Sequence, residues 1–373
     1  MLSCCRVNDS YTENEPEFLE SPLVWERILA LADFHGVTPQ LHRSLNIKRL
    51  WDAPSEIRAE LEARFKTNAW KSLRLTSELF RVLDCLRSVG ILAVPYKGPA
   101  LAEMLYGDVA MREYSDLDVL VRAEEVVRSK EALRLIGFTP AMPLPAAQER
   151  AYVGTGYEYT FDGSASKNML EIQWNFVPRF FAVDFEMEKI LSRCGSVPVS
   201  GRMLPSLREE DLLLALCVHG AKHLWKRVCW VRDIAGLLER PKLDWGYVRQ
   251  EAERLGIRRI VGVSVELARR LLGSSPEVAR QSSVLTDSAD RNLCQELLQP
   301  GFEHDELDTE SFPYFRWMLR LRERASDRMR FLSRLALTPS IGEWQVVNLP
   351  EPLFPLYRAI RVGRLAGRLA GLR

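Results

Sequence analysis

The stretch GDVAMREYSDLDVLVR, residues 107–122, places two aspartates at the start of an apolar run. Val119, Leu120 and Val121 favour burial, whereas Asp116 and Asp118 require water, a cation or a proton. In a β-strand, residues i and i+2 point to the same face, so both carboxylates would lie on one side of a sheet. Two like charges in such a position repel each other unless something positive lies between them. The stretch therefore predicts a strand with a site for positive charge at its beginning.

Short apolar runs alternate with helical patterns around this stretch, which is typical of a small α/β unit. Polar and glycine-containing segments separate the runs and predict turns. The expected strands cover residues 91–98, 115–121, 157–161 and 169–176, and the expected helices cover residues 100–107 and 123–137.

The segments on both sides of this unit are predicted to be helical. Before the unit, apolar residues recur every three to four positions over residues 21–50 and 54–88. After it, Ser206 and Glu209 match a capping box, followed by expected helices at 211–239, 244–255, 258–272 and 312–335. We therefore expect an α+β fold in four parts: a polar tail (1–20), an N-terminal helical region (21–89), a sheet-containing catalytic domain (90–204) and a C-terminal helical domain with a basic tail (205–373).

The composition is that of an ordinary globular protein, with 47% hydrophobic and 27% charged residues. A net charge of +1 gives no general attraction to nucleic acids or membranes. The seven cysteines show no paired spacing, which favours free thiols over disulfides or a cysteine zinc site. The first residues lack the pattern of a signal peptide, and no run is long and apolar enough to span a bilayer. These features predict a cytoplasmic protein.

A third carboxylate, Glu171, lies in the later expected strand LEIQW. Carboxylates on neighbouring strands, close to a glycine turn that leads into a helix, form a site suited to hard divalent cations. Mg²⁺ prefers a few carboxylate oxygens together with waters and substrate phosphates. Two such ions, about 3.5–4 Å apart, can hold the attacking and leaving oxygens of a phosphoryl displacement.

The order YKG (96–98), short helix, RxxSDLDVLV (112–121), helix and EIQW (171–174) resembles the DNA polymerase beta-like nucleotidyltransferase superfamily. Within it, the chain is most similar to a family of uncharacterised nucleotidyltransferases, over roughly residues 20–365. The resemblance implies a mixed sheet flanked by helices. It also implies metal-dependent transfer of a nucleoside monophosphate from an NTP such as ATP, with release of pyrophosphate.

The same resemblance implies a role for each matching residue. Asp116 and Asp118 would bind two Mg²⁺ ions, for which Mn²⁺ could substitute, and Glu171 would be the third ligand and a candidate proton acceptor. The nucleotide would be contacted by residues near the glycine turn, namely Lys97, Gly98, Arg112 and Ser115. Two positions depart from the family pattern: the turn is Gly98-Pro99 rather than Gly-Gly or Gly-Ser, and Gln173 stands where histidine is frequent.

His219 and His223 in HGAKH have the i, i+4 spacing that places two imidazoles on one helix face. This spacing is compatible with zinc, but an apolar face around it also fits buried core histidines. A third interpretation puts both histidines in a substrate cleft, with Lys222 and Arg232 as neighbours.

The C-terminal tail contains Arg361, Arg364 and Arg368 on one face of an expected helix. Such a helix could contact an acidic membrane surface, a nucleic acid or a partner protein. Alternatively, it packs on the protein and leaves a solvated basic edge.

Three functions remain open from the sequence. The first is a nucleotidyltransferase acting on a small molecule, peptide or protein. The second uses an RNA end as acceptor, which the near-neutral charge does not favour because phosphate contacts need clustered cations. The third is a degenerate module that binds a nucleotide or a partner, consistent with Gly98-Pro99 and Gln173.

Overall fold

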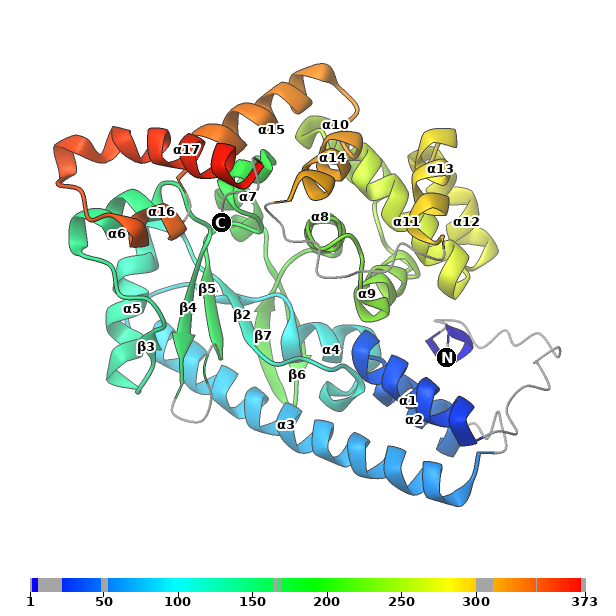
Figure 1. Cartoon of the computed structure of the whole chain (residues 1–373). Helices are drawn as coiled ribbons and strands as arrows, with labels where there is room; N and C mark the ends of the chain where they lie inside the picture. Colours follow the sequence, from blue (N-terminus) through cyan, green and yellow to red (C-terminus); the bar gives the residue numbers. More distant parts are fainter. Residues whose placement is uncertain are drawn as a thin grey trace.

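A five-stranded mixed sheet lies at the centre of the protein in the computed structural model, which describes residues 2–5, 22–47, 53–163, 167, 169–299, 311–339 and 341–369 (Figure 1). The strands follow the order β1-β2-β5-β4-β3, with β2 and β5 parallel and the other neighbours antiparallel. Their bounds are β1 Val94–Pro95, β2 Leu117–Leu120, β3 Thr139–Pro140, β4 Glu158–Asp162 and β5 Leu170–Gln173. The predicted α+β fold with a mixed sheet is confirmed.

The register of the sheet decides which polar side chains share a face. Asp118 on β2 lies opposite Glu171 on β5, and Gln173 on β5 lies opposite Glu158 on β4. Because side chains two residues apart on a strand share a face, these four side chains belong to the same side of the sheet. The remaining side of β2 and β5 is apolar, with Val119 and Ile172 fully buried.

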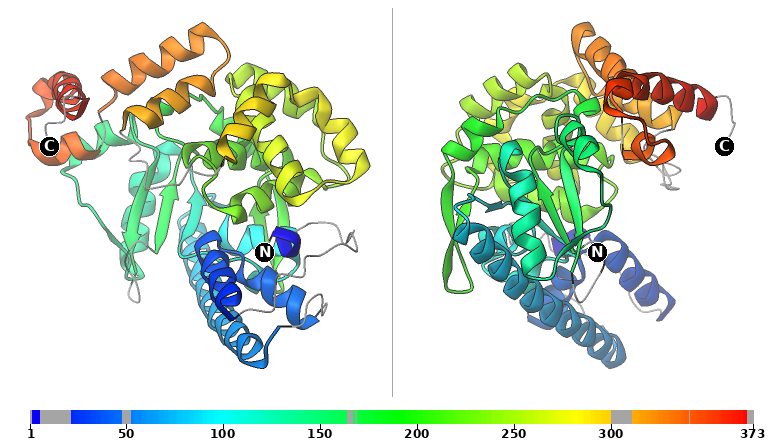
Figure 2. Two further views of the ribbon diagram at one scale, coloured as in Figure 1. Left: turned by 45° about the vertical axis from the view of Figure 1, so that its right-hand side comes forward. Right: turned by 90° about the vertical axis from the view of Figure 1, so that its left-hand side faces the viewer.

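Helices precede, connect and follow the strands of the sheet along the chain. Those of the first half are α1 Pro22–His35, α2 Thr38–His42, α3 Ser55–Ser88, α4 Gly98–Tyr106, α5 Val126–Leu135, α6 Ala146–Val153 and α7 Met187–Ser192. Those of the second half are α8 Glu209–Lys222, α9 Val228–Leu238, α10 Trp245–Leu255, α11 Arg258–Leu272, α12 Pro276–Ser282, α13 Ser288–Leu297, α14 Phe312–Arg320, α15 Ala325–Leu337, α16 Ile341–Val346 and α17 Tyr357–Leu369. The long α3 runs past the sheet, and α17 lies far from α1 (Figures 1 and 2).

The apolar interior consists of two clusters. One joins the N-terminal helices to α8, α9 and α11. The other joins one face of α3, including Leu79 and Val82, to the apolar face of the sheet. The polar face of the sheet, which carries the aspartates, lies where the sheet meets α8 and α9.

Several local predictions were wrong. The expected helix over 21–50 is interrupted after α1 at Gly36, which has a φ of +65°. The expected helix over 312–335 is two helices, α14 and α15. The predicted capping box does not form: the Ser206 hydroxyl donates to the carbonyl of Leu207, and α8 begins without a side-chain cap.

The C-terminal helix α17 packs onto the protein, but not with a fully solvated basic edge. Arg361 is 1% exposed and its guanidinium lies 3.4 Å from the fully buried Glu343 carboxylate on α16. Arg364 reaches the same carboxylate at 3.0 Å, and the side chain of Arg368 is outside the described residues. The predicted arginine face is therefore partly an internal contact. In the described part of the chain, no helix combines the length and apolar character that crossing a bilayer demands.

Candidate active site

The predicted acidic residues line one cavity of about 590 Å³ on the polar face of the sheet. Asp118 lies on β2, Asp116 directly precedes this strand, and Glu171 lies on β5. Glu158 adds a fourth carboxylate from β4. Basic side chains line the same cavity, namely Lys71, Lys97, Arg112, Lys222 and Arg227. The site therefore holds both signs of charge within one cavity.

Lys97 and Asp118 form a buried ion pair at the floor of this cavity. The Lys97 ammonium lies 2.8 Å from Asp118 Oδ1, and the two side chains are only 10% and 5% exposed. Burial by itself would lower the pKa of Lys97, but the attraction of Asp118 raises it above its usual value. Lys97 thus stays positively charged and provides the cation that the sequence pattern required beside Asp118.

Gln173 connects the acidic side chains. Its amide nitrogen donates to Glu171 Oε2 at 2.7 Å and to Asp118 Oδ1 at 3.1 Å. Its amide oxygen accepts from the Tyr96 hydroxyl at 2.6 Å, which fixes the orientation of the amide. The residue that departs from the family pattern therefore works as a neutral donor between two carboxylates.

Charge repulsion remains in the site despite these donors. Burial, and then the neighbouring carboxylates Glu158 and Asp118, raise the pKa of Glu171 to about 8. Burial and Asp118 also raise the pKa of Asp116. A group of this kind can hold a proton near neutral pH and release it when positive charge approaches.

The carboxylates fit a divalent metal in the type of donor they offer, since Mg²⁺ prefers carboxylate oxygens. Their present arrangement differs from a finished metal site. Within the described residues, no three His, Cys, Asp or Glu side chains come together in a way that could hold an ion. Lys97 and Gln173 instead both donate to Oδ1 of Asp118.

The predicted nucleotide-binding residues lie beside these acids. Gly98 has a φ of +53° and begins α4, so the backbone turns sharply from Lys97 into the helix. Ser115 is exposed at the cavity wall. Arg112 also lines the cavity, but its Nε donates to Asp233 Oδ2 on α9 at 2.9 Å, and both side chains are buried. Arg112 thus links the sheet region to the C-terminal helices.

Three of the four residues predicted for a substrate cleft line the cavity, and one does not. His219 and Lys222 on α8, and His223 directly after it, form part of its wall. Burial, followed by the nearby Lys222, lowers the pKa of His223 to about 3, and burial lowers the pKa of His219 as well. Both imidazoles are therefore neutral. Arg232 instead packs over the ring of Tyr106, 4.2 Å from its centroid.

Glu158 was missed by the sequence reasoning, although the strand that carries it was predicted. In a hairpin with the strand of Glu171, alternate residues of YEYTF share a face, and this alternation would have placed Glu158 beside the other acids. Tyr96 and Tyr157, which also line the cavity, gave no comparable signal because tyrosines in apolar runs usually belong to the core.

The mixed sheet with acidic residues at two adjacent strands agrees with the fold that the sequence resemblance implied. A family described as uncharacterised nucleotidyltransferases matches residues 21–273, which is more than half of the chain. The chain belongs to this family and is a nucleotidyltransferase.

Two solved structures show a distant likeness. One is the antibiotic-resistance factor ANT(2'')-Ia, with 15% identity, a TM-score of 0.31, and coverage of 61% of this chain and 96% of that one. The other is an antigenic nucleotidyltransferase-like protein from Paracoccidioides brasiliensis, with 12% identity, a TM-score of 0.31, and coverage of 60% and 94%. No curated protein matches the chain. Similarity at this level does not assign a substrate to this chain.

Proposed function

We propose that the protein transfers a nucleoside monophosphate from an NTP to a hydroxyl group of a small molecule, peptide or protein, with a divalent metal ion. The observation that carries the proposal is the group of four carboxylates and Lys97 in one cavity, beside the first residue of α4. A cavity with both signs of charge can bind a metal-complexed triphosphate, whose phosphates need cations and whose metal needs carboxylates. We also place the reaction in the cytoplasm, an assignment supported by the sequence, because its seven cysteines show no paired spacing of the kind that disulfide frameworks have.

Asp116, Asp118 and Glu171 would hold Mg²⁺, as one or two ions, and Mn²⁺ could substitute. When bound, the metal would neutralise charge on the phosphates and on the attacking hydroxyl. Lys97 would release the Asp118 carboxylate and bind phosphate oxygens when the nucleotide enters. The start of α4 at Gly98 would offer backbone N–H groups to the triphosphate.

The transfer step requires one base and one leaving group. The acceptor oxygen forms a bond to the α-phosphorus while the bond from this phosphorus to the pyrophosphate oxygen breaks. Glu171 would take the proton of the hydroxyl.

A second candidate function is nucleotide binding without transfer. Two residues favour it. Lys97 pairs with Asp118 Oδ1, which is an oxygen that a metal ion would need, and Gln173 cannot act as a base. The two candidates differ in their metal requirement, because a binding module can hold the phosphates with cationic side chains alone.

Isothermal titration with ATP, GTP, CTP and UTP, with and without MgCl₂, separates the two candidates. We expect binding of at least one NTP to require Mg²⁺ and to weaken at least tenfold in Asp116→Asn. Asp116 is the better probe because Asp118 also neutralises Lys97. The control is Glu124→Gln, an exposed carboxylate beyond the same strand. Equal binding without metal, or an unaffected Asp116→Asn variant, would contradict the transferase proposal.

A further inference from the structure

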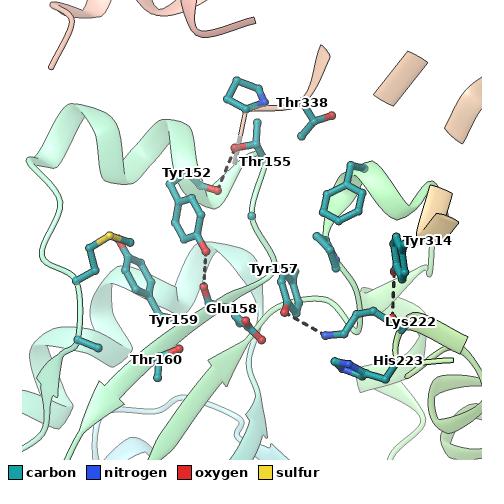
Figure 3. Close-up of a pocket in the computed structure, with 16 residues that line it drawn as sticks. Tyr152, Thr155, Tyr157, Glu158, Tyr159, Thr160, Lys222, His223, Tyr314 and Thr338 are labelled. Carbon is teal, nitrogen blue, oxygen red and sulfur yellow. Dashed lines mark hydrogen bonds between the residues drawn. The ribbon is translucent and has the colours of Figure 1, made fainter. Parts of the chain in front are cut away.

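A second cavity, of about 570 Å³, adjoins the acidic one and has a different chemical character (Figure 3). It lies between β4 and α6 on one side and the helical elements of the second half, represented by Tyr314 and Thr338, on the other. Four residues line both cavities: Tyr157, Glu158, Lys222 and His223. The two volumes therefore meet along one shared wall.

Aromatic and apolar side chains dominate the second cavity. Its rings come from Tyr152, Tyr157, Tyr159, Phe180 and Tyr314. Among its lining residues, the charged side chains are Glu158 and Lys222, one of each sign, and His223 is neutral. Such a lining suits a flat or aliphatic ring with few polar groups. It offers neither the clustered cations that a polyanion needs nor the clustered acids that a polycation needs.

The shared wall is held in place by polar contacts from both sides. Lys222 Nζ donates to the Tyr157 hydroxyl at 3.2 Å and lies 5.1 Å from the centre of the Tyr157 ring. The Tyr152 hydroxyl donates to the carbonyl of Glu158 at 2.8 Å, visible in Figure 3. The Glu158 carboxylate itself is directed to the first cavity, where it accepts from Gln173 at 3.4 Å. A ligand in the second cavity would thus find its nearest charged group at the edge of the reaction site.

We propose that the second cavity binds the acceptor of the transfer reaction, and that this acceptor is an uncharged, ring-bearing alcohol or phenol. The ring lies among the tyrosines, and the hydroxyl passes Tyr157 and Glu158 into the first cavity. This inference rests on the proposed function and names its substrate class. The covalent step is unchanged: the acceptor oxygen bonds to the α-phosphorus, pyrophosphate leaves, and the hydroxyl proton passes to Glu171.

The nucleobase of the NTP is the competing occupant, because it is also an uncharged ring. The first cavity already provides flat surfaces for a base, since Trp230 and the neutral His219 and His223 line it. A nucleotide can therefore be accommodated without the second cavity, which leaves the second cavity for the acceptor.

A matched pair of threonine substitutions tests the inference. Thr160 on β4 lines the second cavity, whereas Thr139 on the neighbouring β3 is exposed and does not line it. Phenylalanine is tolerated in strands, so Thr160→Phe should fill the cavity and Thr139→Phe should serve as its control. Thermal unfolding followed by circular dichroism checks that both variants fold.

Binding of three uncharged probes, 2-phenylethanol, tyrosol and cyclohexylmethanol, is measured by saturation-transfer NMR without nucleotide. Glycerol and spermidine serve as ringless and polycationic comparisons. We expect at least one ring-bearing probe to bind the wild type and Thr139→Phe equally and to bind Thr160→Phe at least tenfold more weakly. Neither comparison compound should bind.

Binding of Mg·ATP to the same three proteins is the second measurement, and we expect it to agree within twofold. A parallel loss of Mg·ATP binding in Thr160→Phe would place the base in the second cavity and overturn the inference. So would a failure of all three probes to bind the wild type, or equal probe binding to both variants. Metal-independent ATP binding with intact probe binding would instead contradict the proposed function and leave the cavity's ligand class supported.

Discussion

At the scale of single residues, the repulsion between Asp116 and Asp118 is reduced by Lys97, which precedes them in the chain by about twenty residues. The sequence contained Lys97 as a phosphate candidate, but no local pattern showed that it would neutralise Asp118. The contact arises because β1 pairs antiparallel with β2, which places the end of one strand beside the start of the other. Long-range pairs of this kind follow from topology and not from spacing.

The buried Lys97–Asp118 pair predicts strong coupling in the free energy of unfolding. Lys97→Met and Asp118→Asn should each destabilise the protein by about 3–5 kcal/mol, because each leaves the partner's charge buried and unpaired. The double variant should lose less than the sum of the two, because it removes both charges. Urea unfolding of the four proteins gives the coupling energy.

The exposed pair Arg122–Glu188 provides the comparison. Its charged atoms are 2.9 Å apart, close to the 2.8 Å of the buried pair, but its side chains are 32% and 63% exposed. A double-mutant cycle with Arg122→Gln and Glu188→Gln should give a coupling energy below about 1 kcal/mol. Similar coupling in both cycles would mean that burial does not distinguish the two pairs.

His223 predicts a pH dependence of stability. The unfolded chain takes up a proton at this residue near pH 6.5, whereas the folded protein does so only at about pH 3. The contribution of His223 to the free energy of unfolding is therefore fully present above pH 6.5 and is lost as the pH falls towards 3. The slope is about 1.4 kcal/mol per pH unit for one proton.

His223→Gln should remove this contribution. Urea unfolding at several pH values between 4.5 and 7.5 should give a pH slope below 6.5 that is smaller by about 1.4 kcal/mol per unit than in the wild type. Parallel curves for the two proteins would show that His223 is protonated in the folded state.

Part of the candidate site could be anticipated from residue patterns. The spacing of Asp116 and Asp118 and the strand around Glu171 predicted side chains that line one cavity, as they do. The position of Arg232 could not be anticipated, because its helical face points to Tyr106 on α4, a contact between distant elements. The metal and nucleotide roles of these residues remain predictions.

At the scale of elements, long periodic segments were predictable and short irregular ones were not. α3, α10 and α11 match their expected ranges closely because the apolar repeat persists over several turns. The hairpin of β6 Gly195–Val199 and β7 Arg202–Ser206 was missed. Its strands contain Pro198 and Pro205, which normally argue against a strand. The signal that remained was the two-residue turn Ser200-Gly201, with positive φ at both positions.

Two glycines, one at the start of α4 and one directly after its end, allow effects on stability and on ligand binding to be separated. Gly98 and Gly107 have φ values of +53° and +67°, so alanine at either position should cost about 1–2 kcal/mol in the free energy of unfolding. Gly98 adjoins the carboxylate cavity, with Asp116 O 3.6 Å from the position of an added Cβ, whereas Gly107 has no neighbour within 4 Å.

We therefore expect only Gly98→Ala to weaken Mg·NTP binding in calorimetry, although both variants lower stability in urea unfolding. Equal binding by both variants would show that the turn into α4 has no part in holding the nucleotide.

At the scale of the whole molecule, the C-terminal segment belongs to the core that supports the site. Trp344 and Tyr357 are 5% and 0% exposed and pack in the same cluster as Val119 and Ile172 of the sheet. Sequence patterns described this segment as a basic tail, because its arginines dominate its composition and its few aromatic residues show no period. Its packing depends on α6 and the sheet, which lie about two hundred residues earlier (Gln148 Nε2 donates to the Tyr357 hydroxyl at 3.4 Å).

Substitutions at Tyr357 test how much the C-terminal segment stabilises the fold. Its ring packs on Trp344 with centroids 4.1 Å apart, and its hydroxyl donates to the carbonyl of Val347 at 2.7 Å. Tyr357→Ala should lower the free energy of unfolding by about 3–5 kcal/mol, because it opens a cavity in the shared core. Tyr357→Phe, which loses only hydrogen bonds, should cost about 1 kcal/mol. Arg358→Ala, at the exposed neighbouring position, should stay within about 0.5 kcal/mol of the wild type. If urea unfolding gave Tyr357→Ala and Arg358→Ala the same stability, the segment would only rest on the surface, and the core that holds the sheet would end before it.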